Sequence, residues 1–280
     1  MVDFLKFKKI YFIFSLVLIL IGLFSIITSG FVFSIDFVGG GLIEFTGKSN
    51  KNIEKRFQAQ DGFYFQKNSG GFIIKSPKLT KAKASEIVKE METGFEVKKK
   101  RFEIVGPSIT IDNIYKIMMA SSLSILAILV YVALSFKSWK YGFAAVAALL
   151  HDTFILVGAW SVLGYLYGAE FDMLFMTALL TTMSFSVHDT IVIFDKIQEE
   201  EEQGEYSTLK ESINWSLNIT MMRSLNNSLT IVLMLSALMI LGGASIKWFA
   251  ASLLIGTVLG TYSSPFVATP IYYLLSKKDT

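Results

Sequence analysis

The sequence predicts a polytopic α-helical membrane protein, with six transmembrane helices and an α+β domain outside the membrane between the first two of them. Three observations lead to this fold class. The mean hydropathy is +0.52, only 18% of the 280 residues are charged against about 25% in soluble domains, and the apolar residues gather in long runs. The absence of cysteine excludes a disulfide scaffold, and a net charge of +3 is too small to indicate a nucleic-acid partner.

A transmembrane helix needs about 20 mostly apolar residues to cross a hydrocarbon core of about 30 Å. Charge-poor runs predict such helices over residues 11–29, 114–136, 141–167, 172–195, 213–241 and 248–275. Between residues 141 and 169 the only charged side chain is Asp152, and between 173 and 194 it is Asp189. The first run exceeds a signal-peptide core of about 7–15 residues, which favours an uncleaved anchor, although Thr28-Ser29-Gly30 resembles a cleavage site.

Lysines flank the predicted helices unequally. In this arrangement one side of the membrane holds Lys6, Lys8, Lys9, Lys137, Lys140, Lys277 and Lys278. The short loops of the other side, 168–172 and 242–247, hold one lysine between them. Because basic residues favour the cytoplasm, both termini are predicted to be cytoplasmic. The loop at about 196–212 lies on the same side, and its four glutamates at 199–202 count little in this rule.

The long loop at residues 31–113 separates region 1–30 from region 114–280 and predicts a soluble domain. The pattern predicts strands at 41–47, 62–66, 72–75 and 96–105 and helices at 50–58 and 79–93, the second with Ala82, Ile87, Val88 and Met91 near one face. This βαββαβ order is typical of a ferredoxin-like domain. We interpret the basic run 98–101 as a solvated edge strand, with a site for an acidic partner as the alternative.

Five Asp, Arg and His side chains lie in the interior of the predicted helices, away from their ends: His151, Asp152, His188, Asp189 and Arg223. A charge at the bilayer centre costs about 2.5–3.5 kcal/mol, so these residues are candidates for an ion pathway. Adjacent helix residues lie on different faces, so we expect neither His–Asp pair to interact within its own helix. The chain lacks a metal-ligand motif such as H-E-x-x-H, and we expect no metal and no other cofactor.

Two stripes of polar residues accompany these groups. Thr182, Ser186 and Asp189 are spaced by four and three residues, and Thr220, Arg223, Asn227 and Thr230 by three, four and three. We expect the two stripes to face each other, so that the carboxylate and the guanidinium satisfy one another. Such an arrangement suits a proton relay, whereas for the neutral residues packing between helices is the alternative interpretation.

Glycines near both ends of the soluble domain predict joints. Gly39 and Gly40 precede no Walker lysine, so a phosphate loop is less plausible than a hinge with close backbone packing. Gly106 and Pro107 similarly mark the return to the membrane. The hypothesis is that protonation of Asp189 breaks its contact with Arg223 and moves the domain.

Five motifs resemble those of the SecF family of bacterial protein-export membrane proteins. In chain order they are Asp36-Phe37-Val38-Gly39-Gly40, Val105-Gly106-Pro107, His151-Asp152, the run from Phe185 to Gln198, and Thr220 with Arg223. The resemblance covers nearly the whole chain. Two departures from the family pattern are His188 in place of an asparagine and Asn227 where a threonine is common.

The resemblance implies one half of a fold like that of the resistance-nodulation-division (RND) transporters. It implies an accessory, non-enzymatic subunit of the Sec translocase in the bacterial inner membrane, with SecD, SecYEG, YajC and preproteins as partners. The family uses the proton motive force in late export steps, and its residues at the positions of Asp189 and Arg223 are associated with proton passage. Because His188 adds a titratable group, sodium is the alternative coupling ion, and a half-size small-molecule transporter is the alternative function.

Overall fold

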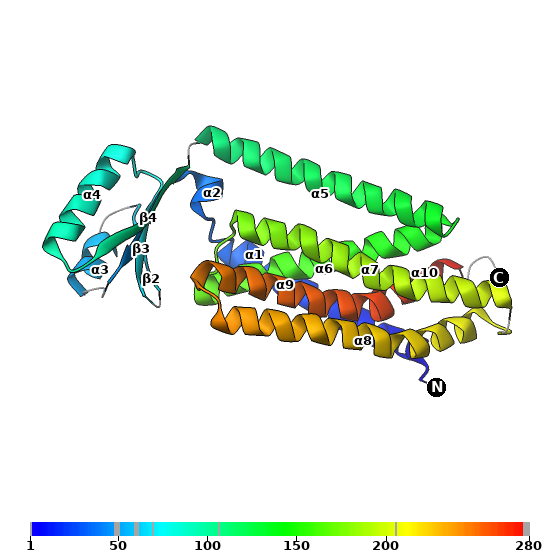
Figure 1. Cartoon of the computed structure of the whole chain (residues 1–280). Coiled ribbons are helices and arrows are strands. Elements are labelled where there is room, and N and C mark those ends of the chain that lie inside the picture. The colour runs from blue at the N-terminus through cyan, green and yellow to red at the C-terminus, as the bar shows by residue number, and fades with distance from the viewer. Residues whose placement is uncertain are drawn as a thin grey trace. The chain divides into compact units, whose positions relative to one another are not determined.

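A computed structural model describes residues 2–47, 51–58, 62–68, 70–105, 107–204 and 206–276 of the protein (Figure 1). The chain divides into two compact units. The first comprises Met1–Val32, Ala120–Ala169 and Leu174–Thr280, and the second comprises Phe33–Met119 with Glu170–Met173.

The first unit is a bundle of long apolar helices (Figure 1). Its elements are η1 (Phe4–Phe7), α1 (Lys8–Ser29), α6 (Trp139–Tyr167), α7 (Met173–Gln203), α8 (Leu209–Leu241), α9 (Ala244–Ser263), the π-helical turn η2 (Ser264–Ala268) and α10 (Thr269–Ser276), together with the later part of α5 (Pro107–Ser135). Six helical stretches in the described part of the chain are long and apolar enough to cross a membrane, which confirms the six predicted spans.

Several helices extend beyond the spans predicted for them. Helix α7 continues to Gln203, and α8 begins at Leu209 rather than at residue 213. The Thr208 side chain caps α8 by accepting from the Glu211 amide, a capping-box pattern that lies outside the charge-free run. A charge-free run marks the hydrocarbon-embedded part of a helix, whereas backbone hydrogen bonding continues into the aqueous ends.

The helices of the bundle differ in how much the chain itself buries them. The apolar windows of α6, α7 and the sixth span are 50%, 56% and 61% buried, against 11% for α1 and 17% for α8. Glycines allow the closest helix contacts, because a Cβ on Gly22 of α1 would lie 2.8 Å from Gly158 Cα of α6. Likewise, a Cβ on Gly260 of α9 would lie 3.0 Å from Ser186 Cα of α7. Helices α6, α7 and α9 therefore form the centre of the bundle.

The second unit contains a four-stranded antiparallel sheet in the order β2-β3-β1-β4. Its elements are α2 (Ile35–Val38), β1 (Gly40–Thr46), α3 (Lys51–Gln58), β2 (Tyr64–Asn68), β3 (Gly71–Ser76), α4 (Lys81–Gly94) and β4 (Lys98–Val105), followed by the start of α5. Strand β3 lies between β1 and β2 of the first βαβ half, and β1 lies between β3 and β4 of the second half. This arrangement confirms the predicted ferredoxin-like order.

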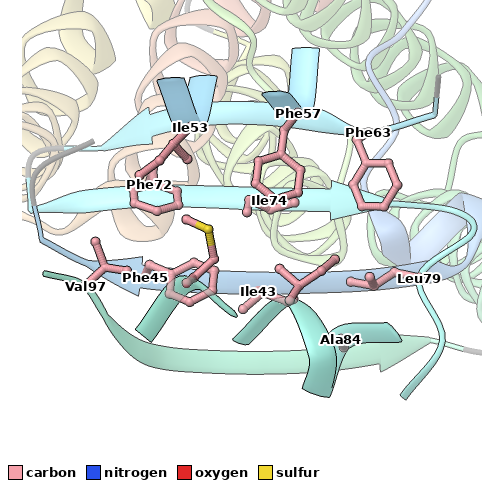
Figure 2. Packing of buried hydrophobic residues seen from close by; sticks show 12 residues of the cluster. Ile43, Phe45, Ile53, Phe57, Phe63, Phe72, Ile74, Leu79, Ala84 and Val97 are labelled. Atoms are coloured by element: carbon pink, nitrogen blue, oxygen red, sulfur yellow. The ribbon is translucent and has the colours of Figure 1, made fainter. Parts of the chain in front are cut away.

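One face of the sheet forms the core of the second unit (Figure 2). Alternate residues of the central strands, such as Ile43 and Phe45 of β1, point toward Phe57 and the other apolar side chains of the helices (Figure 2). On α4 the buried residues are Ala84, Ile87 and Met91. The prediction for Ala82 was wrong, because spacings of three and four residues from Ala84 keep one helix face toward the sheet and leave Ala82 exposed.

The basic run 98–101 lies on β4, an edge strand of the sheet, as predicted. All four side chains are exposed. Lys100 pairs with Glu44 at 2.8 Å and Arg101 pairs with Glu103 at 2.7 Å. Cations on an edge strand hinder pairing with another chain, so this placement fits the interpretation as a solvated edge.

Candidate functional site

The candidate site lies in the centre of the bundle, where α6, α7 and α9 meet around Asp152. The close approach of Gly260 brings Ser186 of α7 within reach of the carboxylate, and Ser263 reaches it from α9. Asp152 itself is 7% exposed and lies near the middle of α6. Three helices therefore contribute to one buried polar cluster.

Both carboxylate oxygens of Asp152 have hydrogen-bond partners from within the chain. Its Oδ2 accepts from Ser186 Oγ and from Ser263 Oγ, each at 2.6 Å. Its Oδ1 lies 2.9 Å from His151 Nδ1. Both hydroxyl groups donate to the same carboxylate oxygen. The hydrogen-bond partners of Asp152 therefore come from this chain and do not require a partner chain.

The contact between His151 and Asp152 contradicts the expectation that neighbouring helix residues do not interact. That rule describes where the Cβ atoms lie, whereas the side-chain torsions of His151 bring its ring nitrogen back to the Asp152 carboxylate. Among the described residues no hydrogen-bond partner reaches His151 Nε2, which is buried. The imidazole ring lies 6.2 Å from the ring of Tyr262.

A second group of hydroxyls continues from this cluster along α7. Thr190 Oγ1 and Ser264 Oγ share a hydrogen bond of 2.8 Å, and both residues are buried. Ser264 is the first residue of the π-helical turn, a feature that occurs frequently at functional sites. Ser263 and Ser264 were not predicted from the sequence, because they lie in a span without charged residues. The sequence Ser263-Ser264-Pro265 in the middle of an apolar span was the available signal.

Asp189 has a different environment. It lies on α7 and is half-buried, and its Oδ2 accepts one hydrogen bond, of 3.0 Å, from Ser224 Oγ of α8. The neighbouring His188 is exposed. Asp189 therefore has part of its surface directed out of the chain, in contrast to Asp152.

The stripe predicted on α8 does not face α7 as expected. Thr220 is buried, but Arg223, Asn227 and Thr230 are exposed. In this part of α8 the buried polar residues are instead Thr220, Ser224 and Ser228, which continue a row spaced by four that begins at Ser212 and Ser216. In the described part of the chain Asp189 therefore receives its bond from Ser224, and the expected contact with Arg223 is not found. Thr220 belongs both to the predicted stripe and to the buried row, so the spacing of polar residues alone could not show which face of α8 is buried.

The predicted stripe on α7 is largely buried. Thr182 and Ser186 both lie inside the bundle, but their partners differ from those expected. Ser186 donates a hydrogen bond to Asp152 of α6 and not to a residue of α8. Thr182 donates to the Leu179 carbonyl of its own helix, which fits its interpretation as a packing residue. A Cβ on Gly256 would lie 2.1 Å from the Thr182 side chain, so this contact requires glycine.

In the second unit, Asp36 joins two segments that are distant in the sequence. Its Oδ2 accepts from Ser34 Oγ at 3.1 Å and from the Met173 amide, at the first residue of α7, at 3.2 Å. Phe37 packs edge-to-face against Phe171 at 5.5 Å. The loop residues Glu170–Met173 are thereby attached to the second unit.

The backbone conformation at the predicted first joint requires glycine. Gly39 and Gly40 have φ values of +73° and +111°, and a Cβ on Gly40 would lie 2.4 Å from the Ser76 carbonyl. The close packing predicted for this segment is thus present. At the second joint, Val105 ends β4 and Pro107 begins α5, whereas Gly106 lies outside the described residues.

Within the described residues, no group of three His, Asp or Glu side chains is arranged to hold a metal ion. The chemistry available to the bundle is therefore that of two unequal carboxylates, their hydroxyl donors and a buried imidazole. Such groups can accept and release protons or bind a small cation.

Comparisons with known proteins place these observations in a family. Residues 83–278 match the family described as "Protein export membrane protein SecD/SecF, C-terminal". The chain is 34% identical to the protein translocase subunit SecF of Thermobaculum terrenum, over 100% of this chain and 95% of that protein. It is 31% identical to the SecF subunit of Haemophilus influenzae, over 97% of this chain and 85% of that one.

Solved structures agree with the sequence comparisons. A crystal structure of SecDF from Thermus thermophilus, described as a translocon-associated membrane protein, superposes with a TM-score of 0.88 at 28% identity. The match covers 100% of this chain and 39% of the SecDF chain. A SecDF structure in a "super-membrane-facing form" gives a TM-score of 0.72 at 26% identity, with 99% of this chain and 39% of that chain covered.

Proposed function

Because the chain belongs to the SecD/SecF family of protein-export membrane proteins, and is thus an accessory component of Sec protein export, we propose that it acts with SecD to use the proton motive force in the late steps of export. SecYEG, YajC and translocating preproteins are the further partners in this proposal. The chain spans 39% of the SecDF chain that it resembles.

The exposed polar face of α8 is the observation that carries the proposal. Arg223, Asn227 and Thr230 lie within a span of Leu209–Leu241, yet the chain does not cover them. A bare guanidinium in hydrocarbon costs about 2.5–3.5 kcal/mol on insertion scales. A partner that covers this face with polar side chains removes the cost. We assign SecD to this position.

The ion path in this proposal lies at the covered face and not in the centre of the bundle. Asp189 has one hydroxyl donor and a surface open to the partner, and His188 is exposed on the same helix. These two residues and Arg223 are the coupling groups that we propose. Asp152 and His151 form the fixed inner part, in which His151 Nε2 has no hydrogen-bond partner among the described residues. Protons are the proposed ion, and sodium is the alternative.

The proposed route from ion binding to export passes through α7. Asp189 lies on α7, and the first residue of that helix, Met173, donates its amide to Asp36 of the second unit. An ion pair between Lys75 and Glu170 also attaches the preceding loop to the sheet. A shift of α7 on protonation would reach the α+β unit along the helix itself, through its first residue.

The membrane arrangement that we propose follows the lysine distribution. Both termini and the loop around residues 196–212 are cytoplasmic, and the α+β unit is extracytoplasmic, in the bacterial inner membrane. Attachment of a cysteine-specific, membrane-impermeant reagent to single cysteines introduced at Lys98 and at Gln203 tests this orientation. Labelling of intact cells at position 98 but not at 203 is the expected result.

The decisive experiment compares two carboxylate variants. Asp189→Asn should abolish the stimulation of preprotein export by an ion gradient in vesicles that contain SecD and the translocon, while the protein remains in the membrane. Asp112→Asn is the matched control, because it removes the same charge from an exposed ion pair with Lys116 on α5. Normal stimulation in Asp189→Asn would overturn the coupling role.

Co-purification distinguishes export from small-molecule transport. The proposal expects SecD and SecYEG to be retained with the chain in mild detergent, and expects Arg223→Gln to weaken retention of SecD. Retention of neither, together with gradient-driven movement of a dye by the chain alone, would favour the transporter.

A further inference from the structure

A cavity of about 610 Å³ lies at one end of the helix bundle, within the range of about 300–1,000 Å³ that is usual for small-ligand sites. It lies where α6 and α8 begin and where α7 and α10 end. These are ends of four of the stretches that are long and apolar enough to cross a membrane, and the ends of such helices meet the headgroup zone of a bilayer. Glu200, Glu201 and Glu202 of the acidic segment contribute to its wall and have no role in the proposed ion path.

Two buried polar atoms on the cavity wall have no partner among the described residues. The Glu200 side chain is 1% exposed, and its Oε1 pairs with Lys196 Nζ at 2.9 Å. Its Oε2 makes no hydrogen bond, and neither does Ser212 Oγ, which is buried nearby in the lining of the same cavity. Buried polar atoms are satisfied in most proteins, so this pair indicates a position for a ligand that donates hydrogen bonds.

The adjacent carboxylate is already occupied, which separates the two glutamates. Glu201 accepts from the Tyr272 hydroxyl at 3.0 and 3.1 Å and from the Tyr141 hydroxyl at 3.3 Å. The rings of Tyr141 and Tyr272 stack at 4.1 Å and form an aromatic wall. Of the three glutamates in the wall, Glu200 is the buried one and has an acceptor oxygen available to a ligand, whereas Glu201 and Glu202 are exposed.

Basic side chains also line the cavity, which limits the charge of its ligand. Lys137 and Lys140 contribute to the wall together with the glutamates. A purely cationic ligand would approach these two lysines at an electrostatic cost, and a purely anionic one would leave the Glu200 oxygen unsatisfied. A zwitterion that carries an ammonium and a phosphate is complementary to both groups.

We propose that this cavity binds the headgroup of a phosphatidylethanolamine lipid. The ammonium donates to Glu200 Oε2 and to Ser212 Oγ, and the phosphate lies toward Lys137 and Lys140. Tyrosines on the wall are typical of the interfacial zone in which such a headgroup resides. With the termini cytoplasmic, as the proposed function has them, this lipid belongs to the cytoplasmic leaflet, and only that assignment rests on the proposed function.

Binding of defined lipids to the purified full chain tests the proposal. Dilauroyl phosphatidylethanolamine, phosphatidylcholine and phosphatidylglycerol are added separately in detergent, and retention is measured by native mass spectrometry. The three N-methyl groups of the choline lipid remove the hydrogen-bond donors, so the ethanolamine lipid should bind about tenfold more tightly. Export is not measured, so a failure here is separate from a failure of the coupling proposal.

Glu200→Gln should remove most of this preference, whereas Glu199→Gln should preserve it, because the Glu199 side chain is exposed and is not in the cavity wall. If Glu200→Gln does not fold, as judged by its melting curve, Ser212→Ala decides the matter and should reduce the preference severalfold. Equal binding of the ethanolamine and choline lipids, or tighter binding of the glycerol lipid, would overturn the proposal. Displacement of the lipid by trilysine would also overturn it, in favour of a site for a basic peptide.

Discussion

Asp152 and Asp189 are both carboxylates in the middle of apolar helices, but they differ in burial and in the hydrogen bonds that they accept. Asp152 receives two hydroxyl bonds of 2.6 Å and the His151 ring nitrogen at 2.9 Å. Asp189 receives one bond, of 3.0 Å, and is half-buried. The first is therefore part of the structure of the isolated chain, whereas the second depends on what covers α7 and α8. A charged residue inside the membrane therefore indicates a function only where the hydrogen-bond donors of its own chain do not already account for it.

The largest effect expected from this comparison is on stability. Asp152→Ala should lower the free energy of unfolding by about 3–5 kcal/mol, because it leaves His151, Ser186 and Ser263 without their common acceptor. Asp189→Ala should lower it by about 0.5–1.5 kcal/mol, since one bond is lost at a half-buried site. Reversible denaturation by SDS in mixed micelles, followed by tryptophan fluorescence, measures both. Equal losses would remove the distinction between the two sites.

The donors of the two carboxylates should show the same contrast at smaller magnitude. Ser263→Ala should cost about 1.5–3 kcal/mol, since it removes a short bond to a charged group, and Ser224→Ala about 0.5–1.5 kcal/mol. A double-mutant cycle should couple Ser263 to Asp152 and leave Ser224 uncoupled from it. Coupling of Ser224 to Asp152 would mean that the two sites are one network.

A third aspartate, outside the membrane, gives a weaker pH-dependent effect. The hydrogen bond from Lys210 holds the pKa of Asp3 below its usual value, assisted by Asn214 and by the Lys6 amide. Its stabilisation is therefore present above the unfolded-state pKa of about 3.9 and is lost as the pH falls through the lower folded-state pKa. Melting temperatures measured from neutral to acidic pH should decline less in Asp3→Asn. An unchanged pH profile would contradict this role.

The smallest effect expected is that of Arg223→Gln on the isolated chain. Because the Arg223 side chain is exposed, the change should alter the free energy of unfolding by no more than about 0.5 kcal/mol. The same substitution should weaken SecD binding in a pull-down from mixed micelles. A large loss of stability in the isolated chain would indicate that Arg223 pairs within the chain, and would break the contrast with Asp152.

Much of the fold could be predicted, because its signals are local. Lack of charge over about 20 residues suffices to predict a span, and alternation of apolar residues suffices for the strands of the α+β unit. The βαββαβ order predicted from these patterns is confirmed by the strand order of the sheet. The ends of α7 and α8 were less accurate, since helices continue past the hydrocarbon that the hydropathy reports.

The candidate site was only partly predictable. Charge alone identified Asp152, Asp189 and Arg223, but their partners are neutral hydroxyls in runs that look uniformly apolar. The motif that contains Asp36 was identified from the sequence. The hydrogen bond that Asp36 accepts from the Met173 amide joins positions 137 residues apart. No local pattern encodes such a contact.

The sequence by itself determined that this protein spans a membrane six times, that an α+β unit follows the first span, and which few charges lie in the apolar helices. These properties depend on composition within a single segment. Only the tertiary structure decided that Ser224 faces Asp189 while Arg223 faces outward, and that Ser186 and Ser263 converge on Asp152. The rotation of a helix about its axis depends on the shape of its neighbours, here on the glycine contact between α9 and α7, and a helix whose polar residues fit two faces leaves that choice to packing.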